Sequence, residues 1–421
     1  MSRPQKNKKI FPARRLAVVC ILVSVAAWIL FCFYIGPVPS DRSAFLVKVL
    51  LAETIKNAVI SAPKIGQIID LNSHVVIKEG TSFDNNVFFA YKSSVIMDIT
   101  PLNTSRVRLI PAAGATIKID NNEYRGEIDV YAEKETLTII NRVDLEDYLK
   151  GVLPGEMNRL WPFETQKAQA IVSRSYAAHL ILKKSHKDYD LKCNTFSQVY
   201  CGKTCERVLT SLAVDKTRDM ILSYDGKILP GYFHSTCGGH TESAKDMWGE
   251  KDTPPLRGVK CENCKWSPYY SWKVGLTPET ISTKLVAAGY KCGKIDDIRA
   301  SEYTGSGRVK FLGILSGDAL TKISASQFIS IMGNRLLRST KFTIEKWKYH
   351  YNFCGNGWGH GVGMCQWGAF KLGIKFKKCS EILAYYYPGA KVADLVEVLR
   401  GYAHHTLPRV ELSDSPHGSV G

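Results

Sequence analysis

An uninterrupted apolar run opens the pattern of hydrophobic and polar positions along the chain. Residues 16–36, LAVVCILVSVAAWILFCFYIG, carry no charge, and about 20 apolar residues match the thickness of a bilayer's hydrocarbon core. The run has no polar face, so it does not fit an amphipathic core helix. A signal peptide has a shorter apolar region of about 7–15 residues that ends at a small-x-small site, whereas aromatic residues crowd the end of this run. We therefore expect an uncleaved, single-pass membrane anchor.

The residues on either side of the run indicate its orientation. The first fifteen residues contain six basic residues and no acidic one: Arg3, Lys6, Lys8, Lys9, Arg14 and Arg15. Because basic residues beside a span are retained in the cytoplasm, we expect residues 1–15 to be a cytoplasmic tail. Residues 37–44, rich in Pro and Ser, would be a linker, and the rest of the chain would lie outside the membrane.

Short β-branched runs fill residues 45–140. Asn, Gly, Pro and Asp separate these runs, as in strands joined by turns: FLVKVLLA, AVISA, GQIIDL, HVVIKEG, NNVFFAY, RVRLIPA and LTIINRV. No residue of this region stands out as catalytic, so we interpret it as a β-rich scaffold or accessory region.

Helical periodicity begins at residue 144. Asp144-Leu-Glu-Asp147 is typical of a capped helix start, and Pro154-Gly155 predicts a break after Gly151. Trp161-Pro162 would start a longer helix, in which small and apolar residues recur every three or four positions through Leu182.

The remaining pattern is mixed. Strands and loops follow Tyr189, and a last helix is predicted over residues 380–387, where Pro388-Gly389 ends it. Residues 391–421 are polar, and we expect them to form a peripheral tail. The predicted fold class is α+β: an N-terminal membrane anchor, a β-rich region, and a mixed α/β domain over residues 141–390.

Composition narrows the class of protein. The chain has 421 residues, of which 45% are hydrophobic and 23% charged, which excludes a mainly disordered protein, a collagen-like repeat and a many-span membrane protein. The length fits two folded units of roughly 100–200 residues.

Removing the six tail charges from the formal net charge of +17 leaves +11 outside the membrane. No nucleic-acid-binding signature is present, so an acidic cell-wall polymer is a better candidate partner than nucleic acid.

Glu156 is the first candidate for chemistry. It follows Pro154-Gly155 between two predicted helices, and Met157, Leu160 and Trp161 provide apolar surroundings. Such surroundings raise the pKa of a carboxyl group, which can then protonate the leaving oxygen of a glycosidic bond. The alternative is a solvated carboxylate that caps the next helix, and the local sequence alone favours this alternative.

A glycine-rich segment is the second candidate. In residues 354–366, CGNGWGHGVGMCQ, five glycines alternate with larger residues. The spacing fits neither a dinucleotide-binding loop nor a P-loop. Glycines allow the backbone to approach a ligand closely, and they would hold His360 and Gln366 at fixed points.

The third candidate is the segment of residues 232–242, YFHSTCGGHTE, with Trp248 further on and Gln198-Val-Tyr200 upstream. Hydroxyl, imidazole and amide groups beside aromatic rings suit a sugar ligand. A Ser-His hydrolase would be another use of His234 and Ser235. Adjacent residues of a strand point to opposite faces, however, so these two would make a poor dyad.

Ten of the twelve cysteines lie outside the apolar run. An even number of cysteines in an exported chain is typical of disulfides. Structural zinc is the alternative, because Cys237-x-x-His240 and Cys261-x-x-Cys264 have the spacing of zinc ligands. The oxidising compartment favours disulfides over zinc.

Taken in order, these segments resemble the SpoIID/LytB family, the stage II sporulation protein D and amidase-enhancer group. The resemblance covers most of residues 45–390, and several blocks in the right order make it specific. The blocks are VDLEDYLKGVLPGEM (143–157), WPFETQKAQAIVSRSY (161–176), QVYCG (198–202), FHSTCGGHTE (233–242), GWGHGVGMCQWGA (357–369) and ILAYYYPG (382–389).

The resemblance implies a lytic transglycosylase that cleaves peptidoglycan glycan strands, preferring strands stripped of stem peptides. It identifies Glu156 as the catalytic residue, against the local interpretation, and the chemistry requires no cofactor. At residues 192–197, where some relatives carry Cys and His, this chain reads KCNTFS, which argues against a metal there. Further side chains expected to contact the substrate, on the resemblance and on the segments above, are Arg174, Gln198, Tyr200, His234, Ser235, Thr241, His360 and Gln366.

A second function stays open at this point. Because the family also includes amidase enhancers, the chain could bind peptidoglycan without cleaving it and stimulate an N-acetylmuramoyl-L-alanine amidase. A zinc peptidase ranks last, since no His-Glu-x-x-His helix is present. Whether the chain is a transglycosylase or an amidase enhancer, the resemblance implies a bacterial cytoplasmic-membrane protein whose folded part lies in the periplasm or outside the cell.

Overall fold

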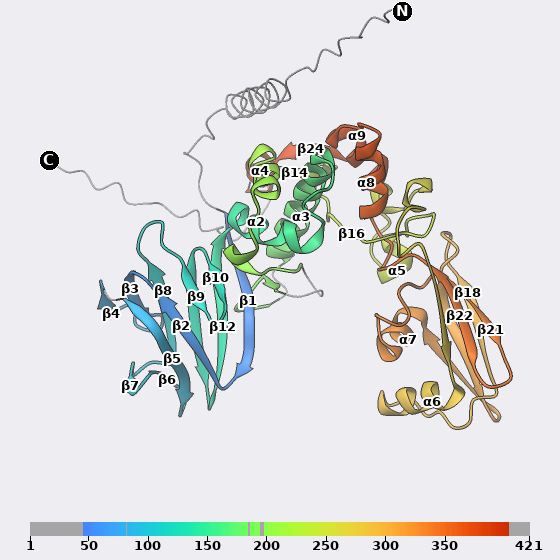
Figure 1. Cartoon of the computed structure of the whole chain (residues 1–421), viewed down its shortest axis with the longest axis horizontal. Helices are drawn as coiled ribbons and strands as arrows, with labels where there is room; N and C mark the ends of the chain where they lie inside the picture. The colour runs from blue at the N-terminus through green and yellow to red at the C-terminus, as the bar shows by residue number, and fades with distance from the viewer. Residues whose placement is uncertain (1–44, 81, 184–185, 194–197, 404–421) are drawn as a thin grey trace, which may run out of the picture. The chain divides into compact units, whose positions relative to one another are not determined.

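The computed structural model describes residues 45–80, 82–183, 186–193 and 198–403 (Figure 1). The expected tail, anchor and linker at residues 1–44 lie outside this described part, as does everything from residue 404 onward. Among the described helices, none is long and apolar enough to cross a bilayer. The predicted combination of strands and helices is confirmed, with a strand-rich first part followed by a mixed part.

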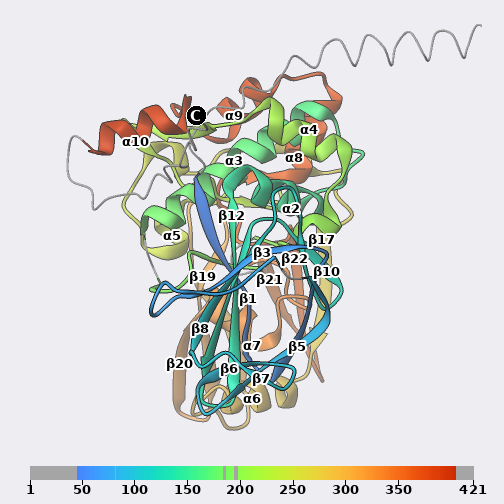
Figure 2. The same cartoon turned by 90° about the vertical axis from the view of Figure 1, so that its left-hand side faces the viewer.

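Two sheets make up the strand-rich part (Figures 1 and 2). The first contains seven strands in the spatial order β13 (Leu191–Lys192), β1 (Leu46–Ile55), β12 (Thr136–Asp144), β11 (Glu127–Glu133), β8 (Arg106–Pro111), β3 (Ile65–Asp70) and β4 (Val76–Glu79). The second contains six, in the order β10 (Asn122–Tyr124), β9 (Ile117–Ile119), β2 (Asn57–Ala62), β5 (Phe83–Tyr91), β6 (Ser94–Met97) and β7 (Thr100–Pro101). Strand β13 runs parallel to β1, whereas β1, β12, β11 and β8 pair antiparallel.

Alternating burial explains how these strands pack. Val107 and Leu109 of β8 are fully buried between more exposed neighbours, and Ala58 and Ile60 of β2 repeat the pattern. A period of two places such side chains on one face of a sheet. They belong to one hydrophobic cluster that takes side chains from both sheets and extends to Leu149 of the next helix.

Helix α2 (Leu145–Glu156) follows β12 directly. It starts as predicted, because the Asp144 carboxylate accepts hydrogen bonds from two backbone N–H groups of the first turn. The predicted break after Gly151 is wrong, since the helix continues through Pro154 to its last residue. Pro154 lacks the N–H of one helical hydrogen bond, but the Met157 N–H donates to the Leu153 carbonyl and closes the last turn.

Helix α3 (Phe163–Lys183) begins one residue after Pro162, close to the predicted start. Its residues Ala168, Ile171 and Val172 are buried in a second hydrophobic cluster. The helix contacts α8 (Gln366–Ile374) and α9 (Cys379–Tyr386), which come from the far end of the sequence. Shorter helical elements complete this part of the chain: η1 (Gly202–Cys205), α4 (Val208–Lys216), α5 (Ala244–Trp248), η2 (Pro254–Leu256) and η3 (Glu262–Cys264).

Residues 271–356 contribute two small sheets with a core of their own, in yellow and orange in Figure 1. One sheet has the order β17 (Ser271–Leu276), β22 (Tyr351–Asn356), β21 (Phe342–Lys346), and the other β18 (Asp297–Tyr303), β19 (Val309–Ser316), β20 (Ala319–Ser324). Helices α6 (Pro278–Ala287) and α7 (Ala325–Met332) pack into the same core.

The residues after 390 differ from the expected tail. Strand β24 (Lys391–Asp394) pairs antiparallel with one edge of β14 (Met220–Tyr224), and β15 (Lys227–Ile228) pairs with the other edge. Helix α10 (Leu395–Ala403) follows β24. The Leu395 side chain is buried in the first cluster. The prediction of a peripheral tail is therefore wrong for residues 391–403, because backbone pairing and an apolar anchor attach them to the fold.

Candidate functional site

A pocket of about 380 Å³ gathers side chains from five of the six sequence blocks. Strand β16 (Phe233–His234) pairs in parallel with β23 (Met364–Cys365), and α8 starts directly after β23. Residues of β16 and the first residue of α8 line one wall of the pocket, and α2 and α3 each contribute one side chain. The lining residues are Glu156, Tyr176, Val199, Tyr232, Phe233, His234, Ser235, Trp248, Trp358, Gly359, His360 and Gln366.

Glu156 is the last residue of α2, and its partly buried side chain reaches the pocket. Its Oε1 atom accepts a hydrogen bond of 2.9 Å from the Val199 N–H. Burial raises the pKa of Glu156 above its usual value, and the Val199 hydrogen bond opposes this shift only in part. Among the described residues that line the pocket, Glu156 is the one carboxylate. The site therefore holds a single carboxyl group suited to carry a proton.

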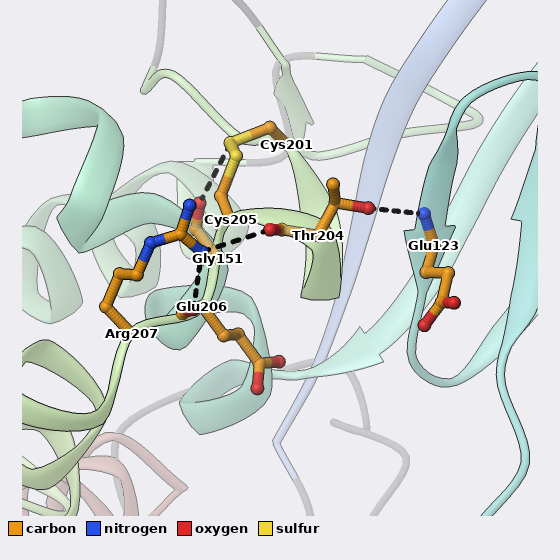
Figure 3. The surroundings of a disulfide bond; sticks show 7 residues. All are labelled: Glu123, Gly151, Cys201, Thr204, Cys205, Glu206 and Arg207. Atoms are coloured by element: carbon orange, nitrogen blue, oxygen red, sulfur yellow. Dashed lines mark hydrogen bonds between the residues drawn. A yellow bond between two sulfur atoms is a disulfide. The ribbon is translucent and has the colours of Figure 1, made fainter.

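The segment that carries Val199 is fixed by a disulfide between Cys201 and Cys205 (Figure 3). Within the bridged turn, Thr204 Oγ1 accepts a 2.7 Å hydrogen bond from the Glu123 N–H of β10. Cys201 Sγ lies 3.8 Å from the carbonyl oxygen of Gly151 in α2. The turn thus ties the Val199 backbone both to the second sheet and to the helix that carries Glu156.

Aromatic rings form one wall of the pocket. The Tyr232 ring lies 4.7 Å from that of Trp248 and 6.0 Å from that of Tyr176, and the Trp248 ring lies 5.0 Å from that of His360. The Trp248 side chain is 45% exposed, so part of its ring surface is open to a ligand. On another side, the Trp358 ring packs edge-on against Tyr269 at 4.6 Å.

Both histidines of the pocket are held neutral. Burial lowers the pKa of His360 to about 4, and it also holds the pKa of His234 well below its usual value. His360 Nε2 donates to the Phe233 carbonyl at 2.8 Å, and its Nδ1 accepts from the Val362 N–H at 3.1 Å. Because the backbone takes both of its ring nitrogens, His360 shapes the wall and does not transfer protons. His234 Nδ1 donates to the Val362 carbonyl at 3.1 Å.

Gln366 and Ser235 play different parts in the site. Gln366 Nε2 donates a 3.0 Å hydrogen bond to the backbone carbonyl of Glu156. The first residue of α8 thereby fixes the last residue of α2, which makes Gln366 a positioning residue. Ser235 is partly exposed and its Oγ atom lies 3.4 Å from Thr236 Oγ1, so it remains available to a sugar hydroxyl.

Arg174 was expected in the groove but lies in the interior. It is fully buried and forms a two-point ion pair with Glu146, with distances of 2.7 and 2.6 Å. Its third nitrogen donates to the Met220 carbonyl at 2.9 Å. The structure therefore does not bring Arg174 to the pocket, since all three of its guanidinium nitrogens bond to interior groups.

Three further predicted substrate contacts are also interior. Gln198 accepts from the Tyr148 hydroxyl at 3.0 Å, and the Tyr200 hydroxyl donates to Asn141 at 2.7 Å. Thr241 Oγ1 accepts from the Val259 N–H at 2.6 Å. Each of the three is buried and absent from the pocket lining. The residues that the structure brings together are Glu156, His234, Ser235, His360 and Gln366.

Four aromatic residues line the pocket that were not among the side chains expected to contact substrate: Tyr176, Tyr232, Trp248 and Trp358. The sequence had placed Tyr232 and Trp248 with the segment suited to a sugar, and Trp358 in the glycine-rich segment. Tyr176 had a weaker signal: it lies outside the predicted apolar stripe through Ala168, Ile171 and Val172, and it is only partly buried.

The cysteines expected to form a zinc site or disulfides are only partly brought together. Cys237, Cys261 and Cys264 are buried with their sulfurs close to one another, and Cys365 is the fourth member of the group. His240 is not part of it, because its Nδ1 hydrogen-bonds to the Thr241 carbonyl at 2.6 Å. The structure therefore groups Cys365, and not His240, with the three expected cysteines.

Comparisons with known proteins give the family. A model described as Stage II sporulation protein matches residues 133–224, and a domain of unknown function matches residues 243–363. A protein of Brachyspira hyodysenteriae with no assigned function is 37% identical over 273 residues, which is 65% of this chain and 73% of that protein. Stage II sporulation protein D of Bacillus subtilis is 28% identical over 281 residues, 62% of this chain and 78% of that protein.

A further relative is the amidase enhancer of Bacillus subtilis. It is 28% identical over 289 residues, which is 57% of this chain but only 39% of the enhancer's length. The matched model covers α2, α3 and the Val199 segment, which together hold Glu156. On these matches and on the blocks that carry them, the chain belongs to the SpoIID/LytB family.

Proposed function

We propose that this chain is a lytic transglycosylase that cleaves the glycan strands of bacterial cell-wall peptidoglycan, with Glu156 as its acid and base. The observation that carries this proposal is the Glu156 carboxyl group, which burial makes harder to ionise in a pocket lined by aromatic rings. A relative named Stage II sporulation protein D supports a role at the cell wall.

The proposed reaction begins with a proton transfer. The protonated Glu156 carboxyl donates to the oxygen that joins N-acetylmuramic acid to N-acetylglucosamine, and the bond from C1 to this oxygen breaks. Positive charge develops at C1 of the muramic acid. The Glu156 carboxylate then takes the proton of the C6 hydroxyl as that oxygen attacks C1. The products are a 1,6-anhydro end and a free C4 hydroxyl, and no water is consumed.

The presence of one carboxylate favours this route over hydrolysis. Ordinary retaining and inverting glycosidases use a pair of carboxyl groups on either side of the bond. Among the described lining residues, Glu156 has no such partner. An internal nucleophile removes the need for a second carboxylate, because the attacking hydroxyl belongs to the same sugar and is already close to C1.

The walls of the pocket suit a sugar substrate. Tyr232 and Trp248 offer ring faces on which the apolar face of a sugar can stack, while Ser235 offers a hydroxyl. The Tyr232 hydroxyl donates to Glu250 at 2.6 Å, so its ring is held in place before any ligand arrives. The volume of about 380 Å³ lies within the usual range for ligand sites.

The proposal includes a location outside the cytoplasm. The disulfide between Cys201 and Cys205 fits an oxidising compartment, and residues 16–36 are proposed to anchor the chain in the cytoplasmic membrane. Peptidoglycan would then be within reach of the folded part.

A second candidate function rests on the relative named Amidase enhancer. The same pocket would bind glycan strands without cleaving them, and the chain would stimulate a peptidoglycan amidase. Both functions use the aromatic wall, but only the transglycosylase needs the Glu156 proton.

The test compares three full-length proteins in mild detergent: wild type, Glu156→Gln, and Glu279→Gln as a matched change at an exposed position of α6. Each is incubated with glycan strands that carry or lack stem peptides, and the products are identified by mass spectrometry. We expect 1,6-anhydro ends from wild type and Glu279→Gln, and at least about 100-fold less product from Glu156→Gln. Free reducing ends would instead identify a hydrolase.

The same samples test the second candidate. If none of the three proteins cleaves but all co-sediment with the strands and accelerate a purified N-acetylmuramoyl-L-alanine amidase, the enhancer function replaces the transglycosylase. If wild type cleaves and does not affect the amidase, the enhancer function is excluded.

A further inference from the structure

Four cysteine sulfurs meet in the interior, just behind the pocket wall. Cys237, Cys261, Cys264 and Cys365 are all buried, and their sulfur atoms lie within 4.8 Å of one another. They come from the segment after β16, the turn around η3, and the end of β23. We propose that these four side chains bind one Zn²⁺ ion as thiolates, in a closed structural site.

The spacing of the sulfurs fits a single tetrahedral ion. With Zn–S bonds of about 2.3 Å, the sulfurs of a tetrathiolate site lie about 3.8 Å apart. Cys237 Sγ and Cys264 Sγ are 3.4 Å apart, and the other pairs stay within the 4.8 Å limit. None of the four is joined to another cysteine in the structure.

Hydrogen bonds to the sulfurs favour thiolates over disulfides. The Cys237 N–H donates to Cys365 Sγ at 3.3 Å, and the Tyr386 hydroxyl lies 3.3 Å from Cys261 Sγ, where it can donate. Metal-bound thiolates are commonly held by such donors. Tyr386 is itself 1% exposed, so its hydroxyl needs a buried acceptor, and a charged sulfur is a better acceptor than a disulfide sulfur.

A buried arginine supplies the second, independent observation. Arg308 is completely buried, and its Nη2 donates to the Cys237 carbonyl at 2.7 Å. Among the described residues, its Nε and Nη1 atoms have no hydrogen-bond partner. A buried cation is costly unless it is paired and hydrogen-bonded. The nearby Glu242 carboxylate favours the Arg308 cation, but its hydrogen bonds go to Ser243, Thr304 and Ser306.

Zinc bound by four thiolates would remove this cost. Such a centre has a formal charge of −2, because four negative sulfurs surround a divalent cation. It would lie beside the Arg308 guanidinium as a counter-charge. Two disulfides or four neutral thiols at the same place would leave Arg308 with less compensation.

The position of the cluster indicates what the ion does. Cys365 pairs with His234 in the parallel register of β16 and β23, and it immediately precedes Gln366. Cys237 lies two residues after Ser235. The ion would therefore join the segment that follows β16, a strand whose side chains line the pocket, to the end of β23, directly before the lining residue Gln366. With four protein ligands it has no open position for substrate, so it braces the site and takes no part in the reaction.

The test measures metal in the full-length protein, purified in detergent without added chelator. Wild type is compared with Cys264→Ser, Cys365→Ser and, as a matched control outside the cluster, Cys292→Ser. Elemental analysis should find about one zinc per chain in wild type and Cys292→Ser, and at least tenfold less in the two cluster variants. A mercurial reagent should release the wild-type zinc as the four thiols react.

Two further measurements keep the proposal falsifiable if the variants fold poorly. When the zinc of wild type is replaced by Co²⁺, the protein should show intense absorption bands at the red end of the visible spectrum, which are typical of a tetrahedral tetrathiolate site. Alkylation of denatured wild type without reductant, followed by mass spectrometry, should label all four cysteines. The proposal is overturned if the purified chain holds no zinc, holds iron in its place, or carries these cysteines as disulfides.

Discussion

Replacing Arg174 by Met tests whether this residue stabilises the interior, as its contacts indicate, or binds substrate, as the sequence predicted. Arg174 lies 28 residues after Glu146 and pairs with it through two hydrogen bonds of 2.7 and 2.6 Å, with the two side chains 0% and 4% exposed. The variant would leave the Glu146 carboxylate buried without its cation, and the Met220 carbonyl without its donor.

The expected loss can be estimated from these contacts. Removing one partner of a buried ion pair costs about 3–5 kcal/mol, because the remaining charge is desolvated without compensation. A double variant, Glu146→Leu with Arg174→Met, removes both charges and should recover most of that loss. It should stay about 1–3 kcal/mol below wild type, since the Met220 and Val214 carbonyls still lose the donor that Arg174 provides.

The assay is urea unfolding of the full-length proteins, followed by tryptophan fluorescence and circular dichroism. Arg159→Met is the matched control, because Arg159 is exposed and its loss should change the free energy of unfolding by less than about 0.5 kcal/mol. If Arg174→Met unfolds at the wild-type urea concentration and loses only glycan binding, Arg174 acts in the groove and the interior assignment fails.

Three other predictions concern the pocket. Since burial raises the pKa of Glu156, the acid form persists above the usual range, and kcat/KM should fall with rising pH along a limb set by this raised value, as measured by product formation at constant ionic strength. The pKa of His360 is about 4 in the folded chain and about 6.5 when unfolded, so at a pH between these values the chain takes up a proton when it unfolds. The free energy of unfolding should therefore fall by about 3 kcal/mol as the pH drops from 6.5 to 4. It should fall less steeply in His360→Gln. Trp248→Ala should raise KM roughly 2- to 10-fold with little change in kcat, whereas an equal loss in kcat would mean that the ring acts on the transition state.

Local patterns in the sequence predicted the elements whose burial follows a simple period. Strands β2 and β8 alternate buried and more exposed positions, and α3 begins just after Pro162. The predicted apolar stripe of α3 does not mark its buried face, because every residue from Ala168 to Ser175 is buried. The end of α2 was missed because local sequence does not show tertiary packing. The proline removes one helical hydrogen bond, but the buried Val152 and Leu153 before it hold the last turn in the core. The separate core of residues 271–356 was missed because short apolar runs do not reveal which sheet they join.

Site residues divide in a way that the sequence could not show. Glu156 and Gln366 belong to blocks 210 positions apart, and only the fold brings the Gln366 amide to the Glu156 carbonyl. Arg174 falls in a block of the same kind, yet it lies in the interior. A motif marks residues that the site depends on, but side chains that touch a ligand and those that hold the scaffold give the same signal.

The Gln198-Val-Tyr200 block illustrates the physical reason. In an extended segment, alternate side chains point to opposite sides: Gln198 and Tyr200 are both buried and bonded to Tyr148 and Asn141, while Val199 between them lines the pocket. The polar side chains, which look like ligands of a sugar, anchor the segment. The group that reaches Glu156 is the Val199 backbone N–H, at 2.9 Å, and every residue type except proline would provide it. The contact that adjusts the proposed catalytic carboxyl is therefore invisible in the sequence, and its position depends on the two anchors that flank it.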